Sequence, residues 1–158
     1  MRRRKLNRST PKRKGKRREL GKYKSSLEKE MANELSNHGI KFDYEPESIT
    51  LVPRFIYKGK YLKMTPKSKL LTDKTGKYVD SITYTPDFVG KEKEFYIEVK
   101  GYNKSNITFT LRWKLFLWWL NNNRTENLPL VFIVKNKQQM IEACAEIKKT
   151  YNDNRTGE

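Results

Sequence analysis

Two carboxylates and a lysine are spaced in a pattern that could bind a divalent cation. Asp87 follows a proline, and Glu98 and Lys100 are two residues apart in a predicted strand, so they share a face. Mg²⁺ prefers carboxylate oxygens and binds through one or two of them together with water or phosphate. A lysine beside them could orient or deprotonate a water molecule, or hold a phosphate oxygen. The alternative is a solvated ion pair on an edge strand, next to an aspartate in an ordinary turn.

Two extended segments must position these side chains. Phe95, Ile97 and Val99 alternate with polar or charged residues and predict a strand over 95–100 whose apolar row anchors it in the core. A second strand is predicted over 81–84, ending just before the aspartate. The pattern therefore predicts that Asp87 and Glu98 meet across neighbouring strands.

The remaining periodicities predict a single α/β (α+β) domain, a mixed sheet with helices on its faces. The N-terminal helix begins at Ser25, with Glu28 three residues later in the spacing of a capping box, and ends at Gly39. The other predicted elements are strands over 40–44, 49–52 and 130–134, a helix from Thr108 or Thr110 to Asn122, and a helix over 138–151.

The charge is concentrated at the N-terminus. Residues 1–24 contain thirteen Lys or Arg and one acid, a net charge of +12 out of +17 for the chain. We expect residues 1–22 to form a disordered basic arm, 23–152 the folded domain and 153–158 a tail. An arm of this charge binds a polyanion, and without an apolar face it is not expected to lie on a membrane. No signal peptide or membrane span is expected either.

Residues 53–79 form a second basic segment, with eight Lys or Arg and one acid. Turn signals at Lys58-Gly59-Lys60 and at 73–76 predict one or two β-hairpins with a basic surface. The alternative is a solvated insertion without a partner.

Single cysteine and histidine residues limit the chemistry. Cys144 cannot form an internal disulfide, which favours a reducing cytoplasm, and a cysteine zinc cluster is excluded. His38 lies at a predicted helix end, where a histidine complements the helix dipole more often than it catalyses a reaction.

The predicted helix that ends at Asn122 is unusually apolar and contains Trp113, Phe116, Trp118 and Trp119. A helix that is apolar nearly all round lies in a core or in a subunit interface. We expect a homodimer with part of this helix in its interface; the competing interpretation is that all these rings fill the monomer core.

In sequence order, Pro86-Asp87 and Glu98-Val99-Lys100 form a motif that resembles the PD-(D/E)XK nuclease signature. Together with Ser26-Leu27-Glu28 and Gly39–Glu45, it resembles the phage endonuclease I family of junction resolvases and related small phage nucleases. The resemblance covers about residues 25–135. The basic segment 53–79 departs from endonuclease I, in which the corresponding region links two swapped active sites.

The resemblance implies a role for each matching residue. Asp87 and Glu98 would bind Mg²⁺, for which Mn²⁺ substitutes, with the Val99 carbonyl as a further ligand. Lys100 would activate or position the attacking water. Glu28 matches a helix glutamate that helps to hold a second metal, although a capping box explains it equally well.

The expected function is a magnesium-dependent endonuclease, homodimeric and selective for branched DNA. The expected location is the cytoplasm, which is that of the host cell if a phage encodes the chain. Alternatives are a non-catalytic DNA-binding or packaging protein and a sequence-specific restriction or repair nickase. The cations expected to contact DNA are Arg2, Arg3, Arg4, Lys12, Arg13, Lys14, Arg17, Arg18, Lys58, Lys60, Arg112 and Lys114. For Arg112 and Lys114 the alternative is snorkelling at the rim of a core helix.

Overall fold

The computed structural model of the 158-residue chain describes residues 20–66, 69–101, 107–124 and 127–156. In chain order its elements are α1 (Ser26–Asn37), β1 (Phe42–Tyr44), β2 (Ile49–Val52), β3 (Phe55–Ile56), β4 (Leu62–Lys63), β5 (Thr72–Asp73), β6 (Tyr78–Val79), β7 (Ile82–Tyr84), β8 (Phe88–Gly90), β9 (Phe95–Val99), α2 (Ile107–Asn123), β10 (Leu130–Val134) and α3 (Lys137–Thr156).

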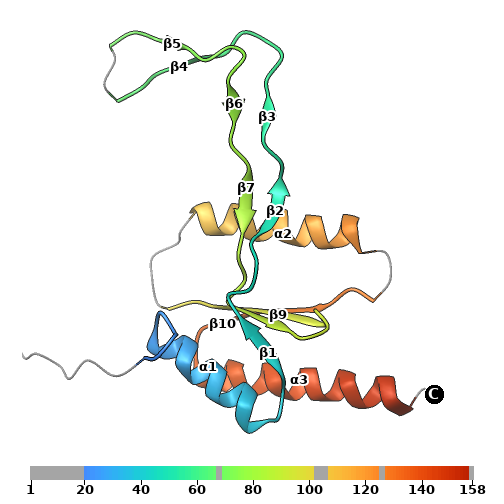
Figure 1. The fold of residues 1–158 in the computed structure, drawn as a ribbon. Helices are drawn as coiled ribbons and strands as arrows, with labels where there is room; N and C mark the ends of the chain where they lie inside the picture. The colour runs from blue at the N-terminus through green and yellow to red at the C-terminus, as the bar shows by residue number, and fades with distance from the viewer. Residues whose placement is uncertain (1–19, 67–68, 102–106, 125–126, 157–158) are drawn as a thin grey trace, which may run out of the picture.

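A four-stranded mixed sheet forms the centre of the fold, in the order β1-β8-β9-β10 (Figure 1). The β1/β8 and β8/β9 pairs are antiparallel, and β9/β10 is parallel. Every residue of β9 is buried, as expected of a strand with neighbours on both sides and helices on both faces. This strand carries Glu98, so the predicted site is attached to a fully buried strand of the sheet.

Helices cover both faces of the sheet, which confirms the predicted α+β class. Helices α1 and α3 lie on one face and α2 on the other (Figure 1). The first core, between α1, α3 and the sheet, includes Met31, Phe88, Ile97 and Met140. The second core lies beneath α2 and comprises Leu51, Tyr84, Val89, Tyr96, Phe116 and Leu120. Within the described ranges, no helix combines the length and apolar character needed to cross a membrane.

The segment between β2 and β7 is a long two-stranded ribbon that projects from the body (Figure 1). Strand β2 pairs with β7, β3 with β6, and β4 with β5, all antiparallel. The base, β2 and β7, packs against α2. We call residues 53–79, the part beyond this base, the basic ribbon.

The turn signals of this segment have a different role from the predicted one. Lys58-Gly59-Lys60 and residues 73–76 are not hairpin tips; they lie on opposite strands, between the β3/β6 and β4/β5 pairs. Gly76 has a φ of +71° there, and the end of the ribbon turns aside at this point (Figure 1). The two signals therefore mark one bend shared by both strands.

The main differences from the predicted elements concern the existence of β8, the end of α3 and the burial of α2. Strand β8 was not predicted, because Phe88-Val89-Gly90 is short and buried on both faces and so shows no alternation. Helix α3 ends at Thr156, beyond the predicted 151. Helix α2 is not buried all round: it forms an outer layer, with Phe116 and Leu120 buried beneath it.

Candidate active site

The structure brings together the three residues of the sequence motif. Asp87 precedes β8, Glu98 lies in β9, and Lys100 directly follows β9. Phe88 pairs with Ile97 in the antiparallel register, so the preceding residue, Asp87, falls beside Glu98. The backbone N–H of Val99 donates a hydrogen bond to Oδ2 of Asp87 at 2.7 Å. The two carboxylates thus lie side by side as predicted, but the strand that neighbours β9 is β8; the predicted strand over 81–84 pairs with β2 instead.

Glu98 is held at both carboxylate oxygens. The Tyr84 hydroxyl donates a hydrogen bond to Oε2, and the Lys100 ammonium forms an ion pair with Oε1. Glu98 is only 4% exposed, so these contacts satisfy a carboxylate that water scarcely reaches. The Lys100 Nζ also lies 4.0 Å from the centre of the Phe109 ring, at the start of α2. Two strands and a helix therefore fix the lysine and the glutamate relative to each other.

The site has an excess of negative charge. Burial, followed by the nearby charge of Glu98, raises the pKa of Asp87 to about 7. The Val99 hydrogen bond and the charge of Lys100 act in the opposite direction but do not compensate. A buried carboxylate with a raised pKa beside a second carboxylate is a typical feature of functional sites, and a bound cation would relieve the repulsion.

The donor set suits one hard divalent cation. Asp87 and Glu98 supply carboxylate oxygens, and the Val99 carbonyl is directed to the same strand edge as its N–H, which faces Asp87. In the part of the chain that the structure describes, no group of three or more His, Cys, Asp or Glu side chains could hold a metal. The geometry is therefore that of a two-carboxylate site completed by water or phosphate, as Mg²⁺ accepts.

Glu28 is engaged by the N-terminus of α1. Its Oε1 accepts a hydrogen bond from the Ser25 hydroxyl at 2.7 Å, and its Oε2 accepts from the Tyr44 hydroxyl at 2.6 Å and from the Lys24 N–H at 2.8 Å. In return, the Glu28 N–H donates to Ser25 Oγ at 3.1 Å, which completes a capping box. Burial opposes ionisation of Glu28, but these hydrogen bonds prevail and lower its pKa.

Glu28 therefore does not join Asp87 and Glu98 as a third metal-binding side chain in this geometry. Its charge contributes to the raised pKa of Asp87, so it belongs to the electrostatic surroundings of the site. Of the two interpretations of Glu28 that the sequence allows, the structure favours the capping box, because Glu28 and Ser25 exchange hydrogen bonds at the start of α1 and no metal-binding group of three carboxylates forms among the described residues.

Replacing Ser25 with Ala is expected to destabilise the fold by about 1 kcal/mol, because one end of the capping box is lost. The DNA cleavage that the resemblance implies should be unchanged at a temperature at which the variant is folded. Urea unfolding and a cleavage assay measure the two effects. Glu28→Gln keeps the shape of the side chain and tests Glu28 directly. If it reduced cleavage as much as an Asp87 variant does, Glu28 would have to be a metal ligand.

Two aromatic residues in the site were not assigned a role from the sequence. Tyr84 holds Glu98, and burial raises its pKa far above the usual range, so it remains a hydrogen-bond donor. Phe109 lies against the lysine. Neither role is visible in sequence spacing, since both depend on how β7 and α2 pack beside β9. The Trp113 ring, 6.1 Å from that of Tyr84, secures α2 in this place.

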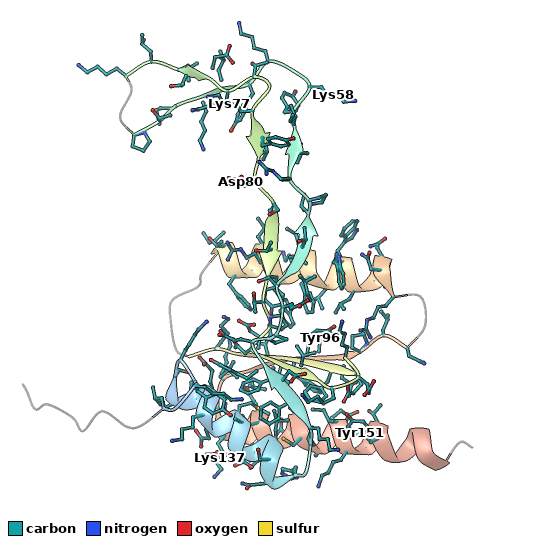
Figure 2. The ribbon with its side chains drawn as sticks, in the orientation of Figure 1. Lys58, Lys77, Asp80, Tyr96, Lys137 and Tyr151 are labelled. Atoms are coloured by element: carbon teal, nitrogen blue, oxygen red, sulfur yellow. The ribbon has the colours of Figure 1, made fainter. Side chains whose placement is uncertain are left out.

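The four predicted DNA-contacting cations in the described ranges lie in two places. Arg112 and Lys114 are exposed on the first half of α2, whose Phe109 and Trp113 contact the site. Lys58 and Lys60 are exposed on the basic ribbon; Figure 2 labels Lys58 there, on the far part of the projection. The other predicted contacts, Arg2, Arg3, Arg4, Lys12, Arg13, Lys14, Arg17 and Arg18, lie outside the described residues.

The single cysteine and the single histidine have structural surroundings. Cys144 is fully buried in α3, and burial raises its pKa to about 11. His38 caps the C-terminus of α1, where its N–H donates to the Glu34 carbonyl at 3.0 Å. Glu28 is in the first turn of that helix, so His38 lies at the opposite end from the candidate site.

A cavity of about 300 Å³ lies beside Pro86 but does not include Asp87 or Glu98 in its lining. Its walls include Ile49, Tyr96 and Trp119. The two carboxylates therefore do not belong to this hollow; they lie where β8 begins and β9 ends. That arrangement suits a reacting group on a large polymer better than an enclosed small molecule.

Comparisons with family models, with curated proteins and with solved structures find no match to this chain. The resemblance to PD-(D/E)XK nucleases therefore rests on the motif and its order in the sequence. The geometry of Asp87, Glu98 and Lys100 is a separate observation.

Proposed function

We propose that this protein is a Mg²⁺-dependent endodeoxyribonuclease that hydrolyses phosphodiester bonds. The observation that carries the proposal is the pair of carboxylates, Asp87 and Glu98, with Lys100 beside them on adjoining backbone segments. This is the constellation that the PD-(D/E)XK resemblance implies. The strong positive charge of the chain supports a polyanionic substrate.

Each residue has a distinct task in this proposal. Asp87 and Glu98 would hold the metal, which supplies Lewis-acid stabilisation of charge on the phosphate and lowers the pKa of a water nucleophile. The Val99 N–H fixes the orientation of Asp87, and the Tyr84 hydroxyl fixes that of Glu98. Lys100, held between Glu98 and Phe109, would position the attacking water or a phosphate oxygen. Arg112 and Lys114 would contact neighbouring phosphates.

Selectivity for branched DNA in phage recombination is the form of this activity that the endonuclease I resemblance favours. A non-catalytic DNA-binding protein is the second candidate, and a sequence-specific nickase the third. The intact set of Asp87, Glu98 and Lys100 supports an enzyme over a binding protein.

Cleavage of three substrates tests the proposal: a supercoiled plasmid, a linear duplex and a four-way junction, each with Mg²⁺ and with EDTA. Metal-dependent cleavage that is fastest on the junction supports a resolvase. Cuts at one sequence in all three indicate a nickase. Binding without any cleavage in Mg²⁺ or Mn²⁺ would contradict the enzyme.

A homodimer is also proposed, with the outer face of α2 in the interface. Trp113 and Trp119 pack against the second core, whereas Trp118 is 58% exposed and Leu111 56% exposed on the same outward side. Four of the five rings of this helix, those of Phe109, Trp113, Phe116 and Trp119, therefore help to fill the monomer, and the fifth is left for a partner. Two-fold symmetry would present two sites for paired cuts, as a junction requires.

Light scattering at micromolar concentration is expected to give twice the monomer mass of 18.9 kDa. Trp118→Gln should shift the protein toward the monomer, because it removes the largest exposed apolar side chain of this face. Leu128→Gln is the matched control, since it removes a side chain that is 57% exposed before β10. A monomeric wild type with full cleavage activity would rule out the dimer and weaken the junction hypothesis.

A further inference from the structure

The basic ribbon is two strands wide beyond its base and exposes apolar side chains on both faces. Phe55 pairs with Val79, and Ile56 with Tyr78, so one pair lies on each face. Phe55 is 46% exposed and Tyr78 59% exposed. A two-stranded hairpin without a further layer is only marginally stable in water. Exposed apolar surface on such an element indicates that it contacts a partner.

The charge of the ribbon indicates the chemistry of that partner. Residues 53–79 contain eight Lys or Arg and one acid, a net charge of +7. Most of these cations are exposed: Arg54, Lys58, Lys60, Lys63, Lys69 and Lys77. Docking of this ribbon against the same ribbon of a second copy would place two charges of +7 side by side. A polyanion is therefore the complementary partner.

The ribbon is shaped by its own contacts. The guanidinium of Arg54 lies 3.9 Å from the centre of the Tyr78 ring. At the bend, the Lys74 N–H donates to the Tyr61 carbonyl at 2.7 Å, and the Tyr61 N–H donates to the Thr75 hydroxyl at 3.0 Å. These contacts hold the two strands together in the protein alone, so less order has to be gained on binding.

We propose that the basic ribbon lies in the major groove of duplex DNA beside the cleavage site. That groove, about 12 Å wide, admits a two-stranded β-ribbon, and its floor offers thymine methyl groups to apolar side chains. The lysines contact the phosphates along the groove walls, and the exposed Met64 and Leu71 near the tip face base edges. The inference rests on the proposed function only in taking DNA as the ligand.

The length of the ribbon sets where these contacts fall. The seven residue-to-residue steps from Val52 to Gly59 reach roughly 23 Å at about 3.3 Å per step. A turn of B-DNA is about 34 Å long. The ribbon lysines therefore contact the duplex more than half a turn away from the body, and the protein binds a duplex arm rather than the scissile bond alone.

The charge test replaces Lys58, Lys60, Lys63 and Lys77 with Gln in the full chain. The matched control replaces Lys41, Lys135, Lys148 and Lys149 with Gln, which removes the same charge from exposed positions on the body. Binding to a labelled 30-base-pair duplex is measured in EDTA at several salt concentrations. The slope of log K against log salt should decrease by about 0.9 for each lost phosphate contact, roughly 3 to 4 in total, for the ribbon variant. The control should change it by less than 1.

The groove test uses dimethyl sulfate, which methylates guanine N7 in the major groove and adenine N3 in the minor groove. Wild-type protein should protect guanine N7, and the ribbon variant should lose part of that protection. Met64→Ala with Leu71→Ala should weaken binding several-fold while leaving the salt slope unchanged, because these side chains contact no phosphate. Protection of adenine N3 instead would overturn the groove assignment.

The outcomes separate this inference from the proposed function. If the wild type binds and cleaves DNA but the ribbon variant and its control have the same salt slope, the ribbon does not bind DNA and the inference fails alone. If the ribbon variant has a lower mass than the wild type in light scattering but the same DNA affinity, the ribbon contacts a second copy of the chain, and the inference also fails. If the wild type does not bind duplex DNA, the proposed function fails with it.

Discussion

Mg²⁺-dependent DNA cleavage is expected to fall by roughly a thousandfold in each of four single variants: Asp87→Ala, Asp87→Asn, Glu98→Ala and Glu98→Gln. Each variant removes one of two carboxylates that would hold the metal, and metal stabilisation of the reacting phosphate is worth several kcal/mol, at about 1.4 kcal/mol per tenfold. DNA binding in EDTA should be retained, because a carboxylate that faces DNA repels it. Single-turnover cleavage of a plasmid or a junction, with binding measured in parallel, checks both effects.

Asp43→Asn is the matched control for this prediction. Asp43 lies in β1 and forms an ion pair with Lys91. Its side chain is about half exposed, and it is not one of the two carboxylates of the candidate metal site. The same chemical change at this position should leave the cleavage rate within about twofold of the wild type. Wild-type cleavage by an Asp87 or Glu98 variant would refute the metal site.

The stability of Asp87→Asn provides a second check, because an inactive variant must also be folded. Burial and Glu98 raise the pKa of Asp87 from 3.8 to about 7, so the folded state binds this proton more tightly than the unfolded state. Stability contributed by this group therefore falls as the pH rises from about 4 to 7, and the full penalty remains above pH 7. Asparagine removes it, so the variant should melt at the same or a higher temperature than the wild type at pH 8 without Mg²⁺.

The sequence was sufficient to predict β9, which carries Glu98, and its neighbour β10, but not β8, at whose start Asp87 lies. Alternation of Phe95, Ile97 and Val99 predicted β9, and the continuous apolar run predicted β10 with its observed bounds, Leu130–Val134. Every residue of β9 is buried, and β10 pairs with β9 and buries Val134, so the core restricts their residue types. The same pattern placed Glu98 and Lys100 on one face, which the ion pair between them confirms.

The remaining features depend on contacts between segments that are distant in the sequence. The hydroxyl of Tyr84 reaches Glu98 only because the fold places the end of β7 next to β9. The spacing of the two residues in the sequence does not reveal this contact. Similarly, the sequence could not decide whether Glu28 binds a metal or completes a capping box, since the answer depends on the Tyr44 hydroxyl from β1. Turn signals give the positions of bends but not whether two of them lie opposite each other, as Gly59 and Gly76 do in the ribbon.

Substitution of the N-terminal cations is expected to produce the largest change in DNA affinity. The variant replaces Arg2, Arg3, Arg4, Lys12, Arg13, Lys14, Arg17 and Arg18 with Gln and so keeps the chain length. If all eight contact phosphates, the slope of log K against log salt should decrease by roughly 7, at about 0.9 for each contact. Binding to a 30-base-pair duplex in EDTA, from low to physiological salt, measures this slope.

The first described residues lie near the candidate site. The chain enters the fold at Lys24, whose N–H donates to Glu28 and whose ammonium forms an ion pair with Glu45. The hydrogen bond to Glu45 is the main cause that raises the pKa of Lys24, and the charges of Glu28 and Asp87 add to it. The described part of the chain therefore begins close to the candidate carboxylates.

Folding should be preserved in this variant, since the first residue that packs against the described core is Tyr23. The melting temperature should stay within a few degrees of the wild type, which separates loss of affinity from loss of structure. The ribbon control, with four body lysines replaced, shows how much of the change comes from net charge alone. An unchanged salt slope in the eightfold variant would mean that the basic N-terminus has another partner, and the basic ribbon with Arg112 and Lys114 would then account for the binding.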